Sequence, residues 1–384
     1  MGGAMDLGWS TIRGELASLV GFATFVVVIL LGDLLSPAAL GNTGALVAGA
    51  LLFSIMLWCA FVVVRHAECL ATLLGEPYGT LILTISVIGI EVALIASVML
   101  AGSDKPTLAR DTMMSVIMIV LNGLVGLSLV LGGLRHRMQA YNLQGANAFL
   151  SVLIPLAVVG LMLPRFTSSA PGGELSDLHA VFLIVMSVAL YGVFLAIQTV
   201  SHSDIFRQPL TDAPLLAGAD AEHDEHHHAL EVRSVPFHAA ALLGALLPIV
   251  LLSKKLAAYV DFGIDTLGAP LALGGFLVAA LILTPEGLTA IHAARVNQLQ
   301  RAVNICLGSA LATIGLTIPV VLAIGWIIDE RIELGLGPVD MIMLALTLIV
   351  SLVTFISART NALQGAVHLA IFAGYVVLIF DNAP

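Results

Sequence analysis

Two glutamates stand in the middle of long apolar runs, where ionisable side chains are rare. Glu91 lies in TLILTISVIGIEVALIASVMLA and Glu286 lies in LGGFLVAALILTPEGLTAIHAA. A charged acid at the centre of a membrane helix costs roughly 2.5–3.5 kcal/mol on insertion scales, so we expect each to serve a function. The structural alternative is a protonated acid that merely hydrogen-bonds a neighbouring helix. Two such acids at matching places favour an ion site over that alternative.

The chemistry open to this pair is the exchange of a cation for protons. Carboxylate oxygens are hard ligands that suit Ca²⁺, and two carboxylates neutralise one divalent cation. Without a cation, two nearby carboxylates in a low dielectric are expected to take up protons. The sequence therefore predicts that Glu91 and Glu286 bind Ca²⁺ and protons in turn.

The composition indicates that the elements holding these acids are membrane helices. Of the 384 residues, 59% are apolar and 10% are charged, against about 45–50% and about 25% in ordinary soluble domains. This excludes a water-soluble fold. With 15 Lys and Arg against 25 Asp and Glu, no basic face is available for nucleic acid. Three cysteines show no zinc or disulfide spacing, and no cofactor is predicted.

Eleven apolar runs are long enough to span a bilayer, which requires roughly 20 residues each. The first is expected to be an uncleaved span, because its apolar core exceeds that of a signal peptide. The fold class is therefore an all-α polytopic membrane protein, placed in the bacterial inner membrane. The predicted spans are residues 17–35, 44–64, 78–101, 112–133, 146–163, 179–200, 237–253, 268–292, 302–327, 339–357 and 364–380.

The longest polar stretch divides the chain into two halves. We expect an N-terminal segment and first span at 1–43, a first repeat at 44–201, a linker at 202–236 and a second repeat at 237–384. Five spans per half is an odd number, so the second half enters from the opposite face as an inverted repeat. Glu91 and Glu286 would then meet at the bilayer midplane. Lys and Arg in the loops favour a cytoplasmic N-terminus and linker and an external C-terminus.

The linker itself is acidic and rich in histidine. This composition is typical of weak, regulatory cation binding, and the alternative is a simply solvated, disordered connection. The residues proposed for such binding are Asp220, Glu222, His223, Asp224, Glu225, His226, His227 and His228.

Helix breaks beside the two acids are a further prediction. Pro285 immediately precedes Glu286, and Gly89 lies two residues before Glu91. Both residue types interrupt helices, and a break would free main-chain carbonyls as additional ligands.

Two segments resemble the alpha-repeat regions of bacterial Ca²⁺/H⁺ antiporters, which belong to the cation/Ca²⁺ exchanger superfamily. They are HAECLATLLGEPYGTLILTISVIGIEVALIASVMLAG and LTPEGLTAIHAARVNQLQRAVNICLGSALATIGLTIPVVLAIG. The resemblance implies that Glu91 and Glu286 are the acids that bind Ca²⁺ and exchange protons. It implies that Glu68 stands at the cytoplasmic mouth of the pathway, and that Ser309 belongs to a Gly-Ser pair packed against the second acid.

The sequence also departs from the superfamily pattern, which often has Gly-Asn shortly before each acid. Here Gly89 and Thr284 occupy those stretches without an asparagine. Accessory oxygens along the pathway are then expected from Thr284 or Asn122. For Asn122 and Ser115, contact with the ion and helix packing are the alternatives.

The function predicted from these features is export of Ca²⁺ in exchange for H⁺ by alternating access. Exchange of Na⁺ or K⁺ for protons at the same site is the alternative, and a passive cation channel is less favoured. An intramembrane enzyme is disfavoured, since the sequence has no H-E-x-x-H motif and no paired catalytic aspartates. The expected partners are the lipid bilayer and the transported ions, and the oligomeric state is left open.

Overall fold

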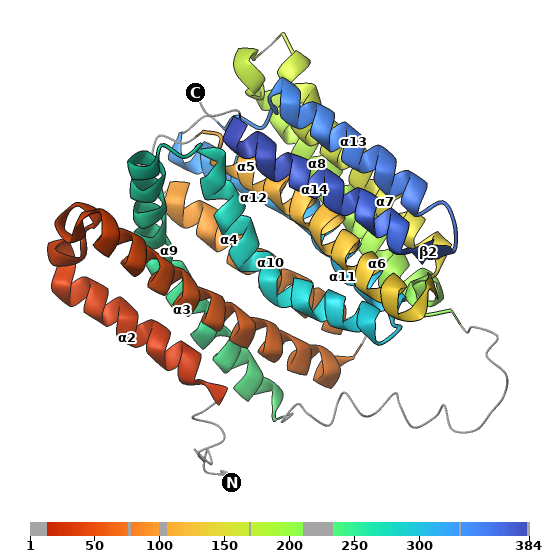
Figure 1. The fold of residues 1–384 in the computed structure, drawn as a ribbon, viewed down its shortest axis with the longest axis horizontal. Coiled ribbons are helices and arrows are strands. Elements are labelled where there is room, and N and C mark those ends of the chain that lie inside the picture. The colour runs from red at the N-terminus through yellow and green to blue at the C-terminus, as the bar shows by residue number, and fades with distance from the viewer. Residues whose placement is uncertain are drawn as a thin grey trace.

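The computed structural model describes residues 14–75, 78–99, 106–168, 170–209, 233–329 and 332–381. These residues fold into eleven helical rods, two of which join a pair of α-helices through a π-helical segment (Figure 1). The rods are α2 (Leu16–Leu31), α3 (Pro37–Leu74), α4 (Tyr78–Met99), α5 (Leu108–Ile117) continuing through a π-helical segment (Met118–Leu124) into α6 (Val125–His136), α7 (Leu143–Ala157), α8 (Asp177–Ala196), α9 (Val235–Leu267), α10 (Ala272–Arg295), α11 (Leu299–Ala312) continuing through a π-helical segment (Thr313–Thr317) into α12 (Ile318–Ile328), α13 (Pro338–Thr354) and α14 (Ala362–Asp381).

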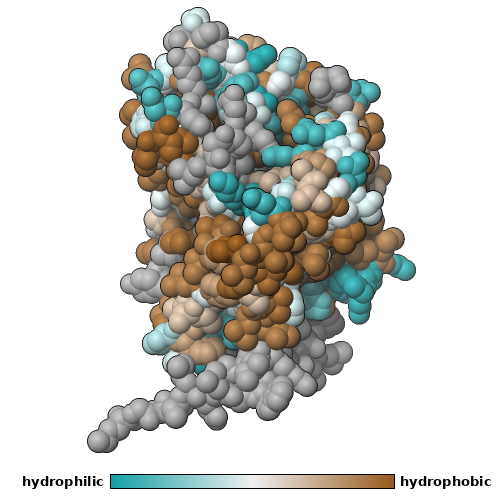
Figure 2. Space-filling view, turned by 90° about the vertical axis from the view of Figure 1, so that its left-hand side faces the viewer, coloured by the Kyte–Doolittle hydropathy of each residue, from teal (hydrophilic) through white to brown (hydrophobic). Residues whose placement is uncertain are grey.

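The outer surface of the bundle is apolar, as a lipid-facing surface must be. Within the described residues, nine helices have the length and composition to cross a membrane, and shorter apolar helices occur at Ile85–Ser97 and Pro338–Thr354. Large apolar side chains are widely exposed, including Leu30, Leu178 and Ile327. Figure 2 shows a broad apolar band across the middle of one face, with hydrophilic groups toward its ends. The prediction of an all-α polytopic membrane protein is confirmed.

The interior is divided into two apolar cores that meet at α4 and α10. One core is formed mainly by α2, α3 and α9, and the other by α5–α8 and α11–α14. In Figure 1 the first group lies on one side of the molecule and the second group on the other. Helix α4 places Leu94 in the first core and Ile95 in the second, and α10 likewise faces both. The two acid-bearing helices therefore lie at the boundary between the cores.

Two helices are much longer than the predicted spans. α3 extends from Pro37 to Leu74 although a span of 44–64 was expected, and α9 extends from Val235 to Leu267 instead of covering 237–253. A helix of 33 residues is about 50 Å long and exceeds the hydrocarbon core, so both helices project beyond it or tilt. Lys254 and Lys255, expected in an outer loop, lie inside α9.

The predicted helix breaks at the acids are wrong. α4 is helical through Gly89, and α10 continues through Pro285 to Arg295. Proline removes one main-chain hydrogen bond, but neighbouring helices support a membrane helix across that gap. The irregular backbone instead lies one helix further on in each half, in the π-helical segments Met118–Leu124 and Thr313–Thr317. The inverted relation of the halves stays a prediction.

Small residues and one short β-ribbon fix how the helices approach each other. A Cβ atom at Gly365 of α14 would lie 2.7 Å from the carbonyl oxygen of Gly126 in α6, so these helices touch through their backbones. At Gly275, a Cβ atom would lie 2.8 Å from the backbone of Asp111, which brings α10 against α5. Strands β1 (Met138–Ala140) and β2 (Arg359–Asn361) pair antiparallel.

Candidate cation site

Glu91 is buried at the centre of the bundle and is held by two threonine hydroxyl groups. Its side chain is 1% exposed. Thr313 Oγ1 donates to Glu91 Oε2 over 2.8 Å, and Thr317 Oγ1 donates to Glu91 Oε1 over 3.1 Å. Each carboxylate oxygen therefore has a hydroxyl partner. Both partners come from the π-helical segment of the other sequence half.

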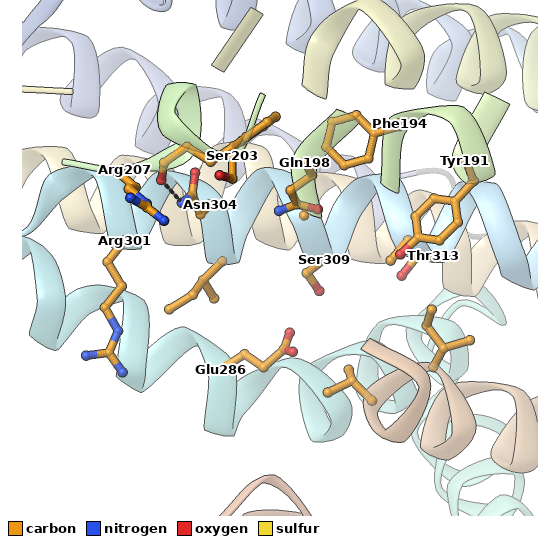
Figure 3. Close-up of a pocket in the computed structure, with 16 residues that line it drawn as sticks. Tyr191, Phe194, Gln198, Ser203, Arg207, Glu286, Arg301, Asn304, Ser309 and Thr313 are labelled. Atoms are coloured by element: carbon orange, nitrogen blue, oxygen red, sulfur yellow. Dashed lines mark hydrogen bonds between the residues drawn. The ribbon is translucent and has the colours of Figure 1, made fainter. Parts of the chain in front are cut away.

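Three hydroxyl side chains form a ladder along one helical rod beside the two acids. Ser309, Thr313 and Thr317 recur at four-residue spacing, which places them on one face about 6 Å apart along the axis. Thr313 and Thr317 bond Glu91, while Ser309 lines the same cavity as Glu286 and lies above its carboxylate in Figure 3. The two carboxylates are close enough for their charges to repel each other. We call these three residues the hydroxyl ladder.

One carboxylate oxygen of Glu286 is available to bind a proton or a cation. Its Oε2 atom is buried and has no hydrogen-bond partner among the described residues. A buried carboxylate oxygen without a partner carries a desolvation cost that a proton or a cation would remove. The site therefore offers two carboxylates and three hydroxyl groups, all hard oxygen donors.

A cavity of about 420 Å³ leads from the linker side of the molecule to Glu286. Glu286, Ser309 and Thr313 line its inner part, and Arg301 and Arg207 line its other end (Figure 3). In Figure 3 the Glu286 carboxylate points from α10 into the space below Ser309. Water and ions entering this cavity would reach the Glu286 carboxylate directly.

A second cavity approaches the acids from the opposite end. It has a volume of about 220 Å³ and is lined by polar groups that include Asp111, Ser253 and Asp261. On α4, Val87 and Ile88 line the first cavity and Leu94 lines the second. Glu91 lies between these positions in the sequence, so the two cavities are separated along α4 at the level of the acid.

Ser115 and Asn122 lie in a helix-packing network instead of beside the acids. Ser115 Oγ is 2.8 Å from Tyr375 Oη. Asn122 Nδ2 donates to Thr347 Oγ1 over 2.8 Å, and its Oδ1 is 3.1 Å from His368 Nδ1. Their hydrogen-bonding groups are occupied by α13 and α14. Packing is the alternative that the geometry favours for both residues.

The other predicted residues occupy varied positions around the pathway. Thr284 Oγ1 donates to the carbonyl of Ala280 in its own helix, and no described contact joins it to an acid. A Cβ atom at Gly89 would meet open space. The charge of Glu68 interacts with those of Glu286 and Arg301, so Glu68 contributes charge near the cavity, and its role in the pathway stays a prediction. Asp220–His228 lie outside the described residues.

Thr313 and Thr317 are the residues that sequence reasoning missed. The Gly-Ser pair and the small residues of this stretch pointed to Ser309 alone. The four-residue recurrence Ser309, Thr313, Thr317 was the available signal, because that spacing aligns hydroxyl groups on one helix face. Among the described residues, no group of three or more His, Cys, Asp or Glu side chains could hold a metal ion.

A polytopic helical bundle with buried carboxylates between two cavities defines a membrane transporter. The chain belongs to the sodium/calcium exchanger protein family, whose match covers residues 44–200 and 237–380. It is 43% identical over 84% of its length to the sodium-potassium/proton antiporter ChaA of Escherichia coli, covering 85% of that protein. It is 22% identical to a Ca²⁺/H⁺ antiporter of Aphanothece halophytica, over 79% of this chain and 82% of that one.

Solved structures show the same fold. Native YfkE superimposes with a TM-score of 0.70 at 18% identity, covering 96% of this chain and 99% of that one. The H⁺/Ca²⁺ exchanger CAX gives a TM-score of 0.64 at 12% identity, over 95% of this chain and 88% of that one. The arrangement of helices is therefore that of known cation exchangers, and the resemblance stated from the sequence is confirmed.

Proposed function

We propose that this protein exports Ca²⁺ in exchange for H⁺ at the Glu91–Glu286 pair. The observation that carries the proposal is the position of the hydroxyl ladder beside both carboxylates, with Thr313 and Thr317 bonded to Glu91 and Ser309 lining the cavity that reaches Glu286. Two carboxylates supply two negative charges, which one Ca²⁺ or two protons neutralise. Loading one ion therefore displaces the other, because a buried site within the membrane does not tolerate excess charge of either sign.

The two cavities supply the access that exchange requires. In the described conformation the larger cavity reaches Glu286 from the linker side, which we place in the cytoplasm. Ca²⁺ would enter there and displace protons from the pair. A shift of the helices that closes this cavity and extends the second one would expose the loaded pair to the outside. Ca²⁺ would then leave, the acids would be reprotonated, and charge balance requires at least two protons per Ca²⁺.

Exchange of Na⁺ or K⁺ for protons is the second candidate, and a specific observation favours it. The relative that is 43% identical is named a sodium-potassium/proton antiporter. The ligands beyond the carboxylates are neutral hydroxyl groups, which serve a monovalent ion as readily as a divalent one. With one bound Na⁺, the second carboxylate would keep a proton and the site would again be neutral.

The experiment that tests the proposal measures dissipation of a pH gradient in everted membrane vesicles, with Ca²⁺, Na⁺ and K⁺ added separately. Wild type is compared with Glu91→Gln and Glu286→Gln, and Asp381→Asn serves as an exposed control. Both glutamine variants should insert normally and lose all cation-driven proton movement. Full activity in Glu286→Gln would refute the assigned site. Responses to Na⁺ and K⁺ without Ca²⁺ would select the monovalent candidate, and cation flux without proton movement would indicate a channel.

A further inference from the structure

A chain of hydrogen bonds at the linker-side end of α3 and α9 joins four parts of the molecule. The Arg233 backbone N–H donates to His238 Nε2 over 2.9 Å. The Nδ1 atoms of His238 and His66 are 2.8 Å apart. His66 Nε2 is 3.0 Å from Oε1 of Glu15, which precedes α2. Both imidazoles are 2% exposed, so water competes little for these bonds.

The two ends of this chain determine where every proton lies. A backbone N–H can only donate, so His238 Nε2 must offer its lone pair to Arg233. A neutral imidazole carries one N–H and one lone pair, so the proton of His238 is on Nδ1 and is donated to His66 Nδ1. The proton of His66 is then on Nε2 and is donated to Glu15. With both histidines neutral, each ring nitrogen has a hydrogen-bond partner, and Arg65 Nη2, which lies 3.1 Å from His66 Nε2, donates to Glu15.

Glu15 ends the chain as an ionised acceptor. Burial raises the pKa of Glu15, but the hydrogen bond from His66 and the neighbouring positive charges, that of Arg65 among them, together lower it below the ordinary value. Arg65 Nη2 donates to Glu15 Oε1 over 2.9 Å and to the carbonyl of Gly14 over 2.8 Å. The carboxylate thus ties the beginning of α2 to α3 through Arg65 and His66.

An additional proton on His238 breaks one of these bonds. It occupies Nε2, where the new N–H faces the N–H of Arg233. Such donor–donor contacts replace attraction by repulsion. The charged groups around the pair are Glu15, Arg65 and Arg233, and the Arg233 guanidinium lies 5.0 Å from the ring centre of Phe237. One carboxylate therefore faces two fixed positive charges.

We propose that the His66–His238 pair is a pH-sensitive latch that holds α2 and the beginning of α9 against α3 while His238 is neutral and opens when His238 is protonated. Histidine changes its charge within the physiological pH range. α3 and α9 both pack against α4, so opening of the latch loosens helices that support Glu91. If the proposed function holds, acidification of the cytoplasm would open the latch and slow the import of further protons.

Substitution by glutamine at either position distinguishes the hydrogen bonds of the latch from its response to pH. In His238→Gln the new side-chain amide would accept from Arg233 with its oxygen and donate to His66 with its nitrogen. His66→Gln would in the same way bridge His238 and Glu15. Both changes keep the hydrogen bonds but remove the ability to take up a proton. His202→Gln is the matched control, since His202 is exposed.

Hydrogen–deuterium exchange of the full-length protein in nanodiscs, followed by mass spectrometry, measures opening of the latch and does not depend on which cation is transported. Between about pH 7.5 and about pH 5, corrected exchange in residues 16–31 and 235–240 should increase in wild type and in His202→Gln. The increase should be lost in His238→Gln, and His66→Gln/His238→Gln serves as a second variant if His238→Gln does not insert. An unchanged pH response in the glutamine variants would overturn the latch. Because exchange is measured without transport, this outcome is independent of whether the Ca²⁺ proposal holds.

Discussion

The Thr313 hydroxyl donates to Glu91 over 2.8 Å and links the acid of the first sequence half to a helix of the second. Ser309, one turn earlier on the same rod, lines the cavity into which Glu286 points. A single helix face therefore lies beside both carboxylates. The first half offers no equivalent in the described residues, since Ser115 and Asn122 bond α14 and α13. The acids are matched in position, but their hydrogen-bond partners are not.

Removing the hydroxyl of Thr313 or Thr317 should weaken cation binding. Valine has nearly the same shape as threonine, so Thr313→Val and Thr317→Val delete one hydrogen bond without opening a cavity. Hydrogen bonds to charged groups contribute about 1.5–3 kcal/mol, so each change should raise the cation concentration for half-maximal transport by about tenfold or more. This concentration is measured from the rate of transport in everted vesicles at increasing cation concentrations. Thr313→Ser keeps the hydroxyl and should behave like wild type, and an unchanged curve for both valine variants would contradict the ladder as a ligand group.

The two cavities should be open to water from opposite sides of the membrane. We predict that a charged, membrane-impermeant thiol reagent labels Ile305→Cys from the linker side and Ala257→Cys from the other side, because these residues line the larger and smaller cavity respectively. A variant lacking Cys59, Cys69 and Cys306 provides the background. Labelling is compared in everted and right-side-out vesicles.

The control for this labelling is Val185→Cys. Val185 is exposed on α8 in the lipid-facing band, so a charged reagent should not reach a thiol there from either side. Labelling of both cavity positions from one side only would contradict two opposed access routes.

The contact between α10 and α5 leaves no room for a side chain at Gly275. In Gly275→Ala the new methyl group would lie 2.8 Å from the backbone of Asp111, so the helices must separate. We expect a loss of about 1–3 kcal/mol in stability, seen as a lower melting temperature in detergent, together with reduced transport. Gly244→Ala is the matched control, because a Cβ atom there meets nothing within 4 Å. Equal melting temperatures for the two variants would show that α10 can shift without cost.

Asn122 should contribute to stability and not to ion selectivity. Asn122→Ala removes one buried hydrogen bond from Thr347 and one from His368, which then keep only Met343 and Thr354 respectively as oxygen partners, and such losses cost about 1–3 kcal/mol each. The melting temperature should fall while the cation concentration for half-maximal transport stays at the wild-type value. A changed order of preference among Ca²⁺, Na⁺ and K⁺ would contradict this prediction and indicate that Asn122 contributes to the ion pathway.

Much of the fold could be predicted from the sequence, because the bilayer sets the length and polarity of each span. The positions of Glu91 and Glu286 stood out for the same reason, since an acid within an apolar run is costly. The lengths of α3 and α9 could not be predicted. A helix does not end where its apolar run ends, and Arg65 and Lys254 continue their helices beyond the run.

The partners of the acids were harder to predict than the acids themselves. A membrane-helix threonine ordinarily bonds a carbonyl of its own helix, as Thr284 does with Ala280, so its sequence context does not reveal a different role. Thr313 and Thr317 bond Glu91 instead because the π-helical backbone presents them to α4. The helix break predicted at Pro285 was wrong for a related reason, since packing around α10 supports the helix across a residue that breaks helices in water.

The β1–β2 ribbon has a mechanical consequence. Its backbone hydrogen bonds fasten the turn after α6 to the turn before α14, and those turns belong to different halves of the sequence. The two sequence halves are thus joined at this end, and moving them apart as separate blocks would break these hydrogen bonds. A movement that keeps the bonds leaves α6 and α14 together and falls at the boundary between the two apolar cores, which does not coincide with the division between the sequence halves.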